Sequence, residues 1–339
     1  MKAFVIKEAG IVVSMETVEP KMGPADVMID VCFVGLCGSD LNSYRGLMPL
    51  VTFPRIPGHE ISGKVLEKGA DVPDTIKIGD RATVSPYTSC GVCPACKAGR
   101  ENTCENNKTF GVQRDGAMTE RIVVPYEKVF VSQILTLHEL ALVEPLSVGY
   151  HATNRGRVNE QDTVLVFGCG AIGMGAVCAS VRKGATVIAV DIDDAKLASS
   201  RFFGATHVIN ALKEDVKSRI AEITNNEGVS IAIEAVGNGE TFKQAIASVC
   251  FAGRVVMIGY AKGETSLDTQ QIIKKELDIL GSRNALRVFP AVIKMLERRE
   301  KPFAKMITRI YPFNETPNAL KDWSANPGIV SKFLIDIKA

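Results

Sequence analysis

Four closely spaced cysteines are the clearest chemical feature of the sequence. They are Cys90, Cys93, Cys96 and Cys104, in the pattern Cys-x₂-Cys-x₂-Cys-x₇-Cys. Thiolates are soft ligands, and four of them suit a tetrahedral zinc ion with no position left for a substrate. The intervening residues are rich in glycine, proline and charge, so burial in a core does not explain the cysteines. We predict a structural zinc site; the alternatives are unrelated thiols, two disulfides or an iron–sulfur cluster.

A second group of residues with metal-ligand side chains is spread along the sequence. It comprises Cys37 in GLCGSD, His59 and Glu60 in PGHE, and Glu144 in EPL. Cys37 and His59 each follow a strand-like run and adjoin a glycine, where exposed ligands are commonly held. Each is weak evidence alone, because a single cysteine is usually a core residue and a single histidine is usually just hydrogen-bonded.

A glycine pattern after an apolar run, VLVFGCGAIG, indicates a dinucleotide site. The first glycine makes a tight turn, the second lets a pyrophosphate approach the backbone, and the third lets a helix pack on the strand. The next strand ends in a carboxylate that can accept the ribose hydroxyls and repels a 2′-phosphate, so NAD is favoured over NADP. The predicted cofactor-binding residues are Gly168, Gly170, Ala171, Ile172, Gly173 and Asp191.

The composition bounds the class of protein that these sites belong to. The chain has 339 residues, 46% of them hydrophobic and 23% charged, which suggests two globular domains. The formal net charge of +2, without a basic block, gives no reason to expect nucleic acid or an anionic membrane as a partner. No run of apolar residues reaches the length of a membrane span, and the N-terminus lacks signal-peptide features. Several of the nine cysteines lie in apolar segments, so we expect a reducing cytoplasm.

The elements that must position these residues change in type along the chain. Residues 1 to about 135 contain short β-like runs at 27–34, 60–67, 81–85 and 119–125. From residue 162 onward, apolar strands alternate with helices, the pattern of a doubly wound parallel sheet, and the last sixty residues are mixed. We predict an α/β protein with a catalytic domain at 1–148, to which 275–339 return, and an NAD-binding Rossmann domain at 149–274.

Together these motifs resemble the medium-chain, zinc-dependent alcohol dehydrogenase family. The motifs GLCGSD, GHE, the four-cysteine loop, EPL and VLVFGCGAIG occur in the family's order over nearly the full length. GHE and EPL are similar to the polyol and threonine dehydrogenase branch, and GSRNALRVFPAVIKML resembles enzymes that oxidise sugar acids such as galactonate or idonate. The resemblance implies a β-rich, GroES-like catalytic domain, an active site in the cleft between the domains, and a dimer or tetramer.

The resemblance also implies roles for individual residues. Cys37 and His59 would bind a catalytic zinc, Glu60 would be a third ligand, and Glu144 would be a ligand or hold the zinc-bound water. Asp40 is similar to the residue that orients the histidine through its second ring nitrogen. Ser39 would hydrogen-bond the substrate hydroxyl and begin a proton relay. Zinc would polarise the alcohol, and NAD would accept its hydride.

One position departs from the family pattern. Many relatives have a histidine five residues after the ligand cysteine, where it ends the proton relay, and this chain has Asn42. The relay could end in water or at Glu144. Tyr44, Arg45, Phe110 and Arg283 are candidates for shaping the substrate pocket, which the sequence does not identify.

The carboxylates beside the predicted zinc favour a small polyhydroxylated substrate, such as a diol, a hydroxy acid or an amino alcohol. The main alternative is a non-catalytic NAD-sensing or zinc-binding protein on the same fold. The zinc-free quinone reductase branch is disfavoured because it lacks both cysteine sets.

Overall fold

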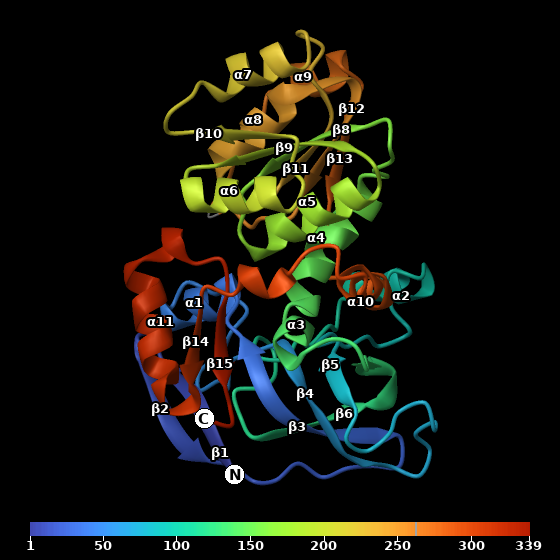
Figure 1. Ribbon diagram of the computed structural model, residues 1–339, viewed down its shortest axis with the longest axis vertical. Coiled ribbons are helices and arrows are strands. Elements are labelled where there is room, and N and C mark those ends of the chain that lie inside the picture. Colours follow the sequence, from blue (N-terminus) through green and yellow to red (C-terminus); the bar gives the residue numbers. More distant parts are fainter. Residues whose placement is uncertain (262) are drawn as a thin grey trace. The chain divides into compact units, whose positions relative to one another are not determined.

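The computed structural model describes residues 1–261 and 263–339, which divide into two compact units (Figure 1). The β-rich unit consists of Met1–Pro145 and Leu286–Ala339, and the parallel-sheet unit consists of Leu146–Ala285. The parallel-sheet unit continues beyond residue 274, the predicted end of the Rossmann domain, as far as Ala285. The reason is that Asp278–Gly281 pairs in parallel with the strand before it and so remains in the parallel sheet.

The parallel-sheet unit is built on six strands in the order β10-β9-β8-β11-β12-β13, all paired in parallel. In chain order this is 3-2-1-4-5-6, the order of a Rossmann fold, as predicted. The strands are β8 (Thr163–Phe167), β9 (Thr186–Asp191), β10 (His207–Asn210), β11 (Val229–Glu234), β12 (Val249–Met257) and β13 (Asp278–Gly281).

Helices cover both faces of this sheet. Figure 1 shows α5 and α6 on one face, and α7, α8 and α9 on the other. Asp193, Asp215, Asn238 and Asp268 begin four of these helices, each accepting a backbone N–H of the first turn with its side chain. The helices are α5 (Ala171–Arg182), α6 (Asp194–Phe202), α7 (Val216–Ile223), α8 (Gly239–Ser248) and α9 (Thr269–Lys274).

The β-rich unit contains a largely antiparallel sheet in the order β14-β15-β3-β4-β5-β7, with β6 also paired to β3, and a separate hairpin of β1 and β2. The C-terminal strand β15 pairs antiparallel with β3, so the last residues of the chain lie beside a strand from its beginning. The strands are β1 (Lys2–Glu8), β2 (Ile11–Glu16), β3 (Asp26–Gly35), β4 (Glu60–Lys68), β5 (Arg81–Val84), β6 (Arg121–Pro125), β7 (Val129–Val131), β14 (Arg309–Pro312) and β15 (Phe333–Asp336).

Short helices connect and cover this sheet, and one continuous core joins the two chain segments. Phe4 from the N-terminal part contacts Phe313 from the C-terminal part edge to face, with ring centroids 5.0 Å apart. α4 (Val143–Arg155) crosses the boundary between the units. The other α-helices are α1 (Gly38–Tyr44), α2 (Pro94–Lys97), α3 (Leu137–Leu140), α10 (Phe289–Glu297) and α11 (Thr316–Ala325). The 3₁₀ helices are η1 (Glu101–Thr103), η2 (Tyr126–Lys128), η3 (Phe303–Met306), η4 (Phe313–Glu315) and η5 (Pro327–Ile329).

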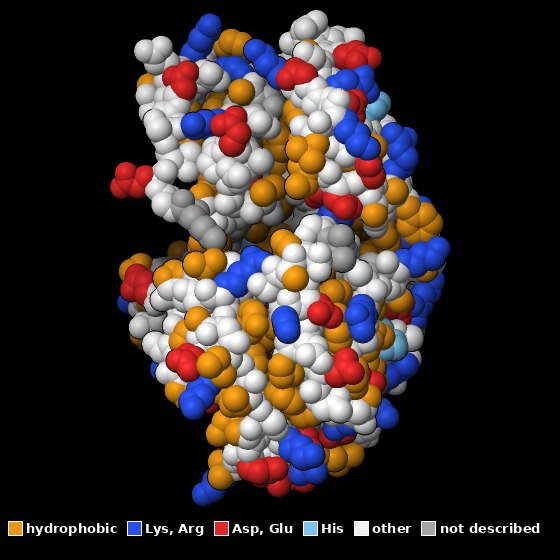
Figure 2. Space-filling model, turned by 90° about the vertical axis from the view of Figure 1, so that its left-hand side faces the viewer, with side chains coloured by type: hydrophobic (Ala, Val, Ile, Leu, Met, Phe, Trp, Pro, Cys, Tyr) orange, Lys and Arg blue, Asp and Glu red, His pale blue; other side chains and the backbone are white. Residues whose placement is uncertain are grey.

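The surface carries charges of both signs. On the face in Figure 2, Lys and Arg side chains are interspersed with Asp and Glu side chains and with apolar ones. Within the described residues, no helix combines the length and the apolar character needed to cross a membrane.

Candidate active site

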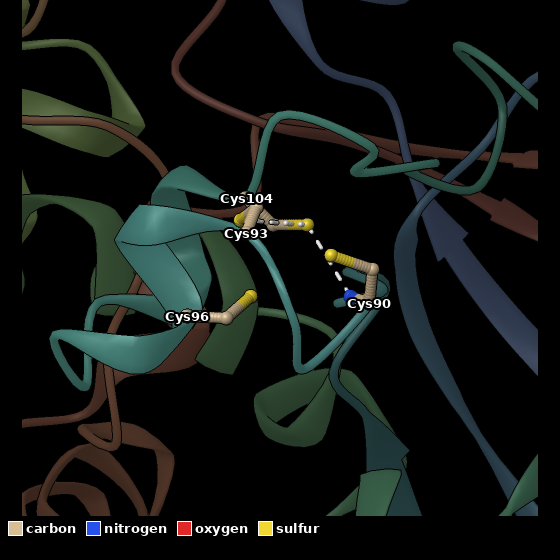
Figure 3. Close-up of side chains that lie close together, drawn as sticks. All are labelled: Cys90, Cys93, Cys96 and Cys104. Atoms are coloured by element: carbon tan, nitrogen blue, oxygen red, sulfur yellow. Dashed lines mark hydrogen bonds between the residues drawn. The ribbon is translucent and has the colours of Figure 1, made fainter.

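The four-cysteine loop brings its sulfur atoms together in the β-rich unit. One ligand atom from each of Cys90, Cys93, Cys96 and Cys104 lies within 4.8 Å of the others, and Figure 3 shows the four side chains turned toward a common space. All four cysteines are free thiols in the structure, so they do not form the two disulfides considered as an alternative. Four convergent sulfurs on a loop with two short helices, α2 and η1, fit a tetrahedral zinc ion.

The backbone of this loop favours the thiolate form at two of the four positions. Hydrogen bonds from the N–H groups of Val92 and Cys93 lower the pKa of Cys90 to about 6. N–H donors likewise lower the pKa of Cys93, whereas burial raises that of Cys96 to about 11. A metal ion binds thiolates, so the loop is partly prepared for one before the ion arrives.

The second ligand group is built where two neighbouring strands meet. Cys37 follows β3 and is the N-cap of α1, and His59 directly precedes β4, whose first residue is Glu60. The ligand atoms of these three residues lie within 4.8 Å of one another. The structure therefore brings together three of the four residues predicted for the catalytic metal, as β3 and β4 pair with Gly35 opposite Glu60.

Asp40 fixes the backbone of this group. Its Oδ2 accepts the N–H of Cys37 at 2.8 Å, and its Oδ1 accepts the N–H of Gly58 at 3.1 Å. Oδ1 lies 4.0 Å from Nδ1 of His59, which is too long for a hydrogen bond. The expected contact with the second ring nitrogen is therefore not made, and Asp40 positions both ligands through the main chain. Although burial would lower the pKa of His59, the negative charges of Cys37 and Asp40 raise it well above its usual value.

Glu60 is held by a lysine from the far end of the chain. Nζ of Lys332 donates to Oε1 of Glu60 at 2.5 Å and to the carbonyl of Leu36 at 2.8 Å, and both charged side chains are buried. Burial raises the pKa of Glu60 to about 7 against the lowering effect of Lys332. A Cβ on Gly35 would lie 2.1 Å from Oε2 of Glu60, so only glycine leaves room for this carboxylate.

Three polar side-chain atoms, two of them in this ligand group and one on the neighbouring Ser39, have no hydrogen-bond partner within the described residues. They are Oε2 of Glu60, Nδ1 of His59 and Oγ of Ser39, all buried. An unsatisfied buried polar atom costs about 1–3 kcal/mol. A metal ion beside Cys37 and a substrate hydroxyl near Ser39 would give such atoms partners, so the residues present fit both.

Glu144 lies in the first turn of α4 and does not belong to the three-residue ligand group. Its Oε1 accepts a short hydrogen bond from the buried hydroxyl of Tyr87. The charge of Glu144 acts on the pKa of both His59 and Glu60, so it is an electrostatic neighbour of the ligand group.

The glycine pattern has the geometry of a phosphate-binding turn in the parallel-sheet unit. Gly168 follows β8 with a φ of 86°, and Gly170 is the N-cap of α5. A Cβ on Gly173 would lie 1.7 Å from the carbonyl oxygen of Gly168, so helix and turn meet closely. A Cβ on Gly170 would have no described atom within 4 Å, which leaves space over the helix start. Ala171 and Ile172 form the first turn of that helix, where free N–H groups suit a phosphate.

Asp191 stands at the end of β9, as predicted, and supports the glycine turn directly. Its Oδ2 accepts the N–H of Cys169 at 2.7 Å, and its Oδ1 accepts those of Ile192 and Asp193 at 2.8 and 3.1 Å. A carboxylate offers about four acceptor positions, so three are already used by the backbone.

Two residues considered for the substrate pocket have other contacts. The guanidinium of Arg45 donates to Oγ and the carbonyl of Ser324, which links α1 to α11. The Phe110 ring lies in the core beneath the guanidinium of Arg114 at 3.8 Å. Asn42 lies in α1, and its carbonyl accepts the N–H of Leu47.

Sequence reasoning missed Lys332, Tyr87 and Gly35. A lysine within the apolar run IVSKFLIDI was a usable signal, because lysine is rarely buried without a partner. Tyr87 and Gly35 carry no comparable signal in a single sequence.

Comparison with known proteins identifies the family. The alcohol dehydrogenase GroES-like domain family matches residues 23–133, and the zinc-binding dehydrogenase family matches residues 171–298. A zinc-type alcohol dehydrogenase-like protein of Haemophilus influenzae, itself uncharacterised, is 39% identical over 96% of both chains. The chain belongs to the zinc-type medium-chain alcohol dehydrogenases.

Relatives and solved structures of this family place the chain in its polyol and sugar branch. Sorbitol dehydrogenase of Bacillus subtilis is 35% identical over 89% of this chain and 87% of its own, and L-galactonate-5-dehydrogenase of Escherichia coli is 32% identical over 87% and 86%. An E. coli alcohol dehydrogenase solved with NADH has a TM-score of 0.92 at 29% identity, covering 99% of both chains. A Sinorhizobium meliloti zinc-binding dehydrogenase solved with NADP has a TM-score of 0.90 at 30% identity, over 99% of this chain and 98% of its own. The family prediction is confirmed, with zinc and a nicotinamide dinucleotide as its cofactors.

Proposed function

We propose that this chain is a zinc- and NAD-dependent dehydrogenase that oxidises a secondary alcohol of a polyol, a sugar acid or a related metabolite. The observation that carries the proposal is the convergence of the ligand atoms of Cys37, His59 and Glu60. Ser39, two positions after Cys37 in the sequence, has a buried hydroxyl without a partner in the described chain. Zinc bound there would supply Lewis acidity to an alcohol, and NAD would supply the hydride acceptor.

The protein's own residues have separate tasks in this proposal. Cys37, His59 and Glu60 hold the metal, and Asp40 keeps the backbone of the first two in place. Ser39 relays the substrate's hydroxyl proton: its Oγ, buried and without a partner in the described chain, takes up that proton as its own hydroxyl proton passes to water or to Glu144. The four-cysteine loop holds a second, structural zinc ion.

The glycine turn and Asp191 bind NAD in this proposal. The open space over Gly170 admits a pyrophosphate. The carboxylate of Asp191 is hydrogen-bonded to the same turn, because it accepts the N–H of Cys169. A 2′-phosphate would bring negative charge toward Asp191, and no arginine follows it directly in the sequence. The solved relatives include both an NADH and an NADP complex, so the preference has to be measured.

The substrate class rests on the relatives' names and on the charge of the site. Sorbitol and galactonate dehydrogenases act on polyhydroxylated compounds, as their names state. Glu60 and Glu144 provide carboxylate oxygens near the metal position, and Lys332 offsets part of their charge. A substrate with two adjacent oxygens suits such a site better than ethanol does.

A substrate panel tests the proposal. The zinc-loaded protein is mixed with polyols, aldonates, threonine and ethanol, each with NAD and with NADP, and NADH or NADPH absorbance is followed. We expect turnover of at least one polyhydroxylated compound with NAD and a loss of about 10²–10⁴-fold in kcat for Ser39→Ala. Ser43→Ala, in the same helix but bonded to the Ser39 carbonyl, is the matched control. Efficient turnover of ethanol alone would overturn the substrate class.

The alternative from another class is a non-catalytic NAD-sensing or zinc-binding protein. It predicts tight NADH and zinc binding with no turnover of any compound in the panel. The complete set of Cys37, Ser39, His59 and Glu60 favours the enzyme.

We also propose a homo-oligomer located in the cytoplasm. The nine free cysteines are compatible with a reducing compartment. Light scattering of the purified protein would give the oligomeric state, and a monomer would contradict the proposal.

A further inference from the structure

The two carboxylates near the ligand group are held by partners of different chemistry. Glu60 is paired with a buried cation, Lys332, and its ligand atom belongs to the group with Cys37 and His59. Glu144 instead accepts the phenol of Tyr87, and it lies outside that group within the described residues. Tyr87 and Glu144 are 6% and 4% exposed, so solvent does not compete for this bond.

Tyr87 is a neutral donor that the surrounding loop holds in place. Burial and the charge of Glu144 raise the pKa of Tyr87 well above its usual value, so its phenol stays protonated. The residues on either side are fixed: Phe110 N–H donates to the carbonyl of Pro86, and Lys108 N–H donates to Oγ1 of Thr88 at 2.6 Å. The hydroxyl is therefore presented to Glu144 by a constrained segment just before the four-cysteine loop.

Removing the phenol takes one hydrogen-bond donor from a buried carboxylate and so weakens the hold on its position. Cys37 and Glu60 both act electrostatically on Tyr87, so the phenol and Glu144 sit at the edge of the ligand group. If Glu144 joined Cys37, His59 and Glu60, a bound zinc ion would have four protein ligands, which is the closed arrangement of a structural site.

We propose that Tyr87 is a positioning residue that holds Glu144 beside the Cys37–His59–Glu60 group and so keeps a bound metal open to exchange with substrate. This inference rests on the proposed function only in that the group holds a metal. It adds a task for Tyr87 that concerns metal lability and does not depend on which alcohol is oxidised.

The test replaces zinc by cobalt and compares the full-length protein with Tyr87→Phe. The part of the cobalt absorption that is lost in the variant Cys37→Ser is assigned to the Cys37–His59–Glu60 group. We expect Tyr87→Phe to slow the transfer of that cobalt to a chelator about 10-fold, because replacing residues that contact metal ligands typically changes metal affinity by about 10–100-fold. The visible spectrum of the bound cobalt should change as well. The double variant Tyr87→Phe/Glu144→Gln should restore the original release rate, because a neutral amide is a poor ligand.

Tyr311→Phe is the matched control, since Tyr311 also donates its hydroxyl to a carboxylate, that of Asp322 at 2.8 Å, and Asp322 is not among the ligand residues. It should leave cobalt release unchanged. Unchanged or faster release in Tyr87→Phe, or slow release that persists in the double variant, would overturn the role of Tyr87. If the unmodified protein takes up metal only at the four-cysteine loop, the proposed function fails as well, so the two failures are distinguishable.

Discussion

Removing Lys332 should destabilise the β-rich unit through the carboxylate it leaves behind. The Lys332 side chain is 4% exposed and the Glu60 side chain is 1% exposed, so neither charge has water as a substitute partner. Lys332→Met removes the bonds to Glu60 Oε1 and to the Leu36 carbonyl. Breaking a buried pair by removing one partner costs about 3–5 kcal/mol. For a unit of about 200 residues this corresponds to a fall in Tm of roughly 10 °C.

The assay can be confined to the unit that contains the pair. Trp323 is the single tryptophan, lies in α11 of the same unit, and is packed near Phe333, directly after Lys332. Urea unfolding of metal-free protein, followed by Trp323 fluorescence, reports this unit. The double variant Lys332→Met/Glu60→Gln should recover most of the loss, because no buried charge remains unpaired. Bound zinc should also reduce the loss by providing Glu60 with another cation.

Two outcomes would refute this reasoning. If the effects of Lys332→Met and Glu60→Gln simply add, the two residues do not act as a pair. If Lys332→Met costs less than about 1 kcal/mol in metal-free protein, the pair resembles an exposed salt bridge despite its burial.

Three further predictions concern single residues. Gly35→Ala should lower metal affinity at the catalytic group by roughly 10–100-fold in a metal titration, because its Cβ would collide with the Glu60 carboxylate; unchanged affinity would contradict this packing. Cys90→Ser should reduce the metal content by one ion per chain in elemental analysis, and an unchanged content would argue against a zinc ion in the four-cysteine loop. Asp191→Ala should weaken NAD binding by roughly 10–100-fold in an NADH fluorescence titration and narrow the preference over NADP, since it removes both a ribose acceptor and the bond to Cys169 N–H. Better turnover with NADP by the unmodified protein would contradict the predicted preference.

The parallel-sheet unit could be predicted in detail because its signals are local. The strands and helix at 163–167, 171–182 and 186–191 follow the predicted alternation of apolar strands and helices, since each apolar run ends at a glycine or a charged residue. β12 starts at Val249, before the apolar run that begins at Val255. Ala252 has a left-handed φ of 55° within this strand. The structure resolves this as an irregular strand because its neighbour β11 pairs with both parts.

The ligand residues could also be found from the sequence, but their partners could not. Cys37, His59 and Glu60 sit in short motifs, where neighbouring residues indicate a common purpose. Lys332 is 272 positions away from Glu60, and Tyr87 is 57 positions away from Glu144. Only the pairing of β15 with β3 brings the lysine to the site, and a single sequence does not specify which distant strands pair.

These distant partners decide what each carboxylate can do. The resemblance makes both Glu60 and Glu144 candidates for binding the catalytic metal. A buried cation holds one oxygen of Glu60, and the other has no partner among the residues that the structure describes, next to Cys37 and His59. A phenol holds Glu144, which stays outside that group. Because a carboxylate with one unsatisfied oxygen gains most from a metal ion, Glu60 is the third ligand that the geometry favours. The charge of Lys332 also makes the site less anionic than its two carboxylates suggest, so an alcohol bound there would lose its proton more readily than beside two unpaired carboxylates.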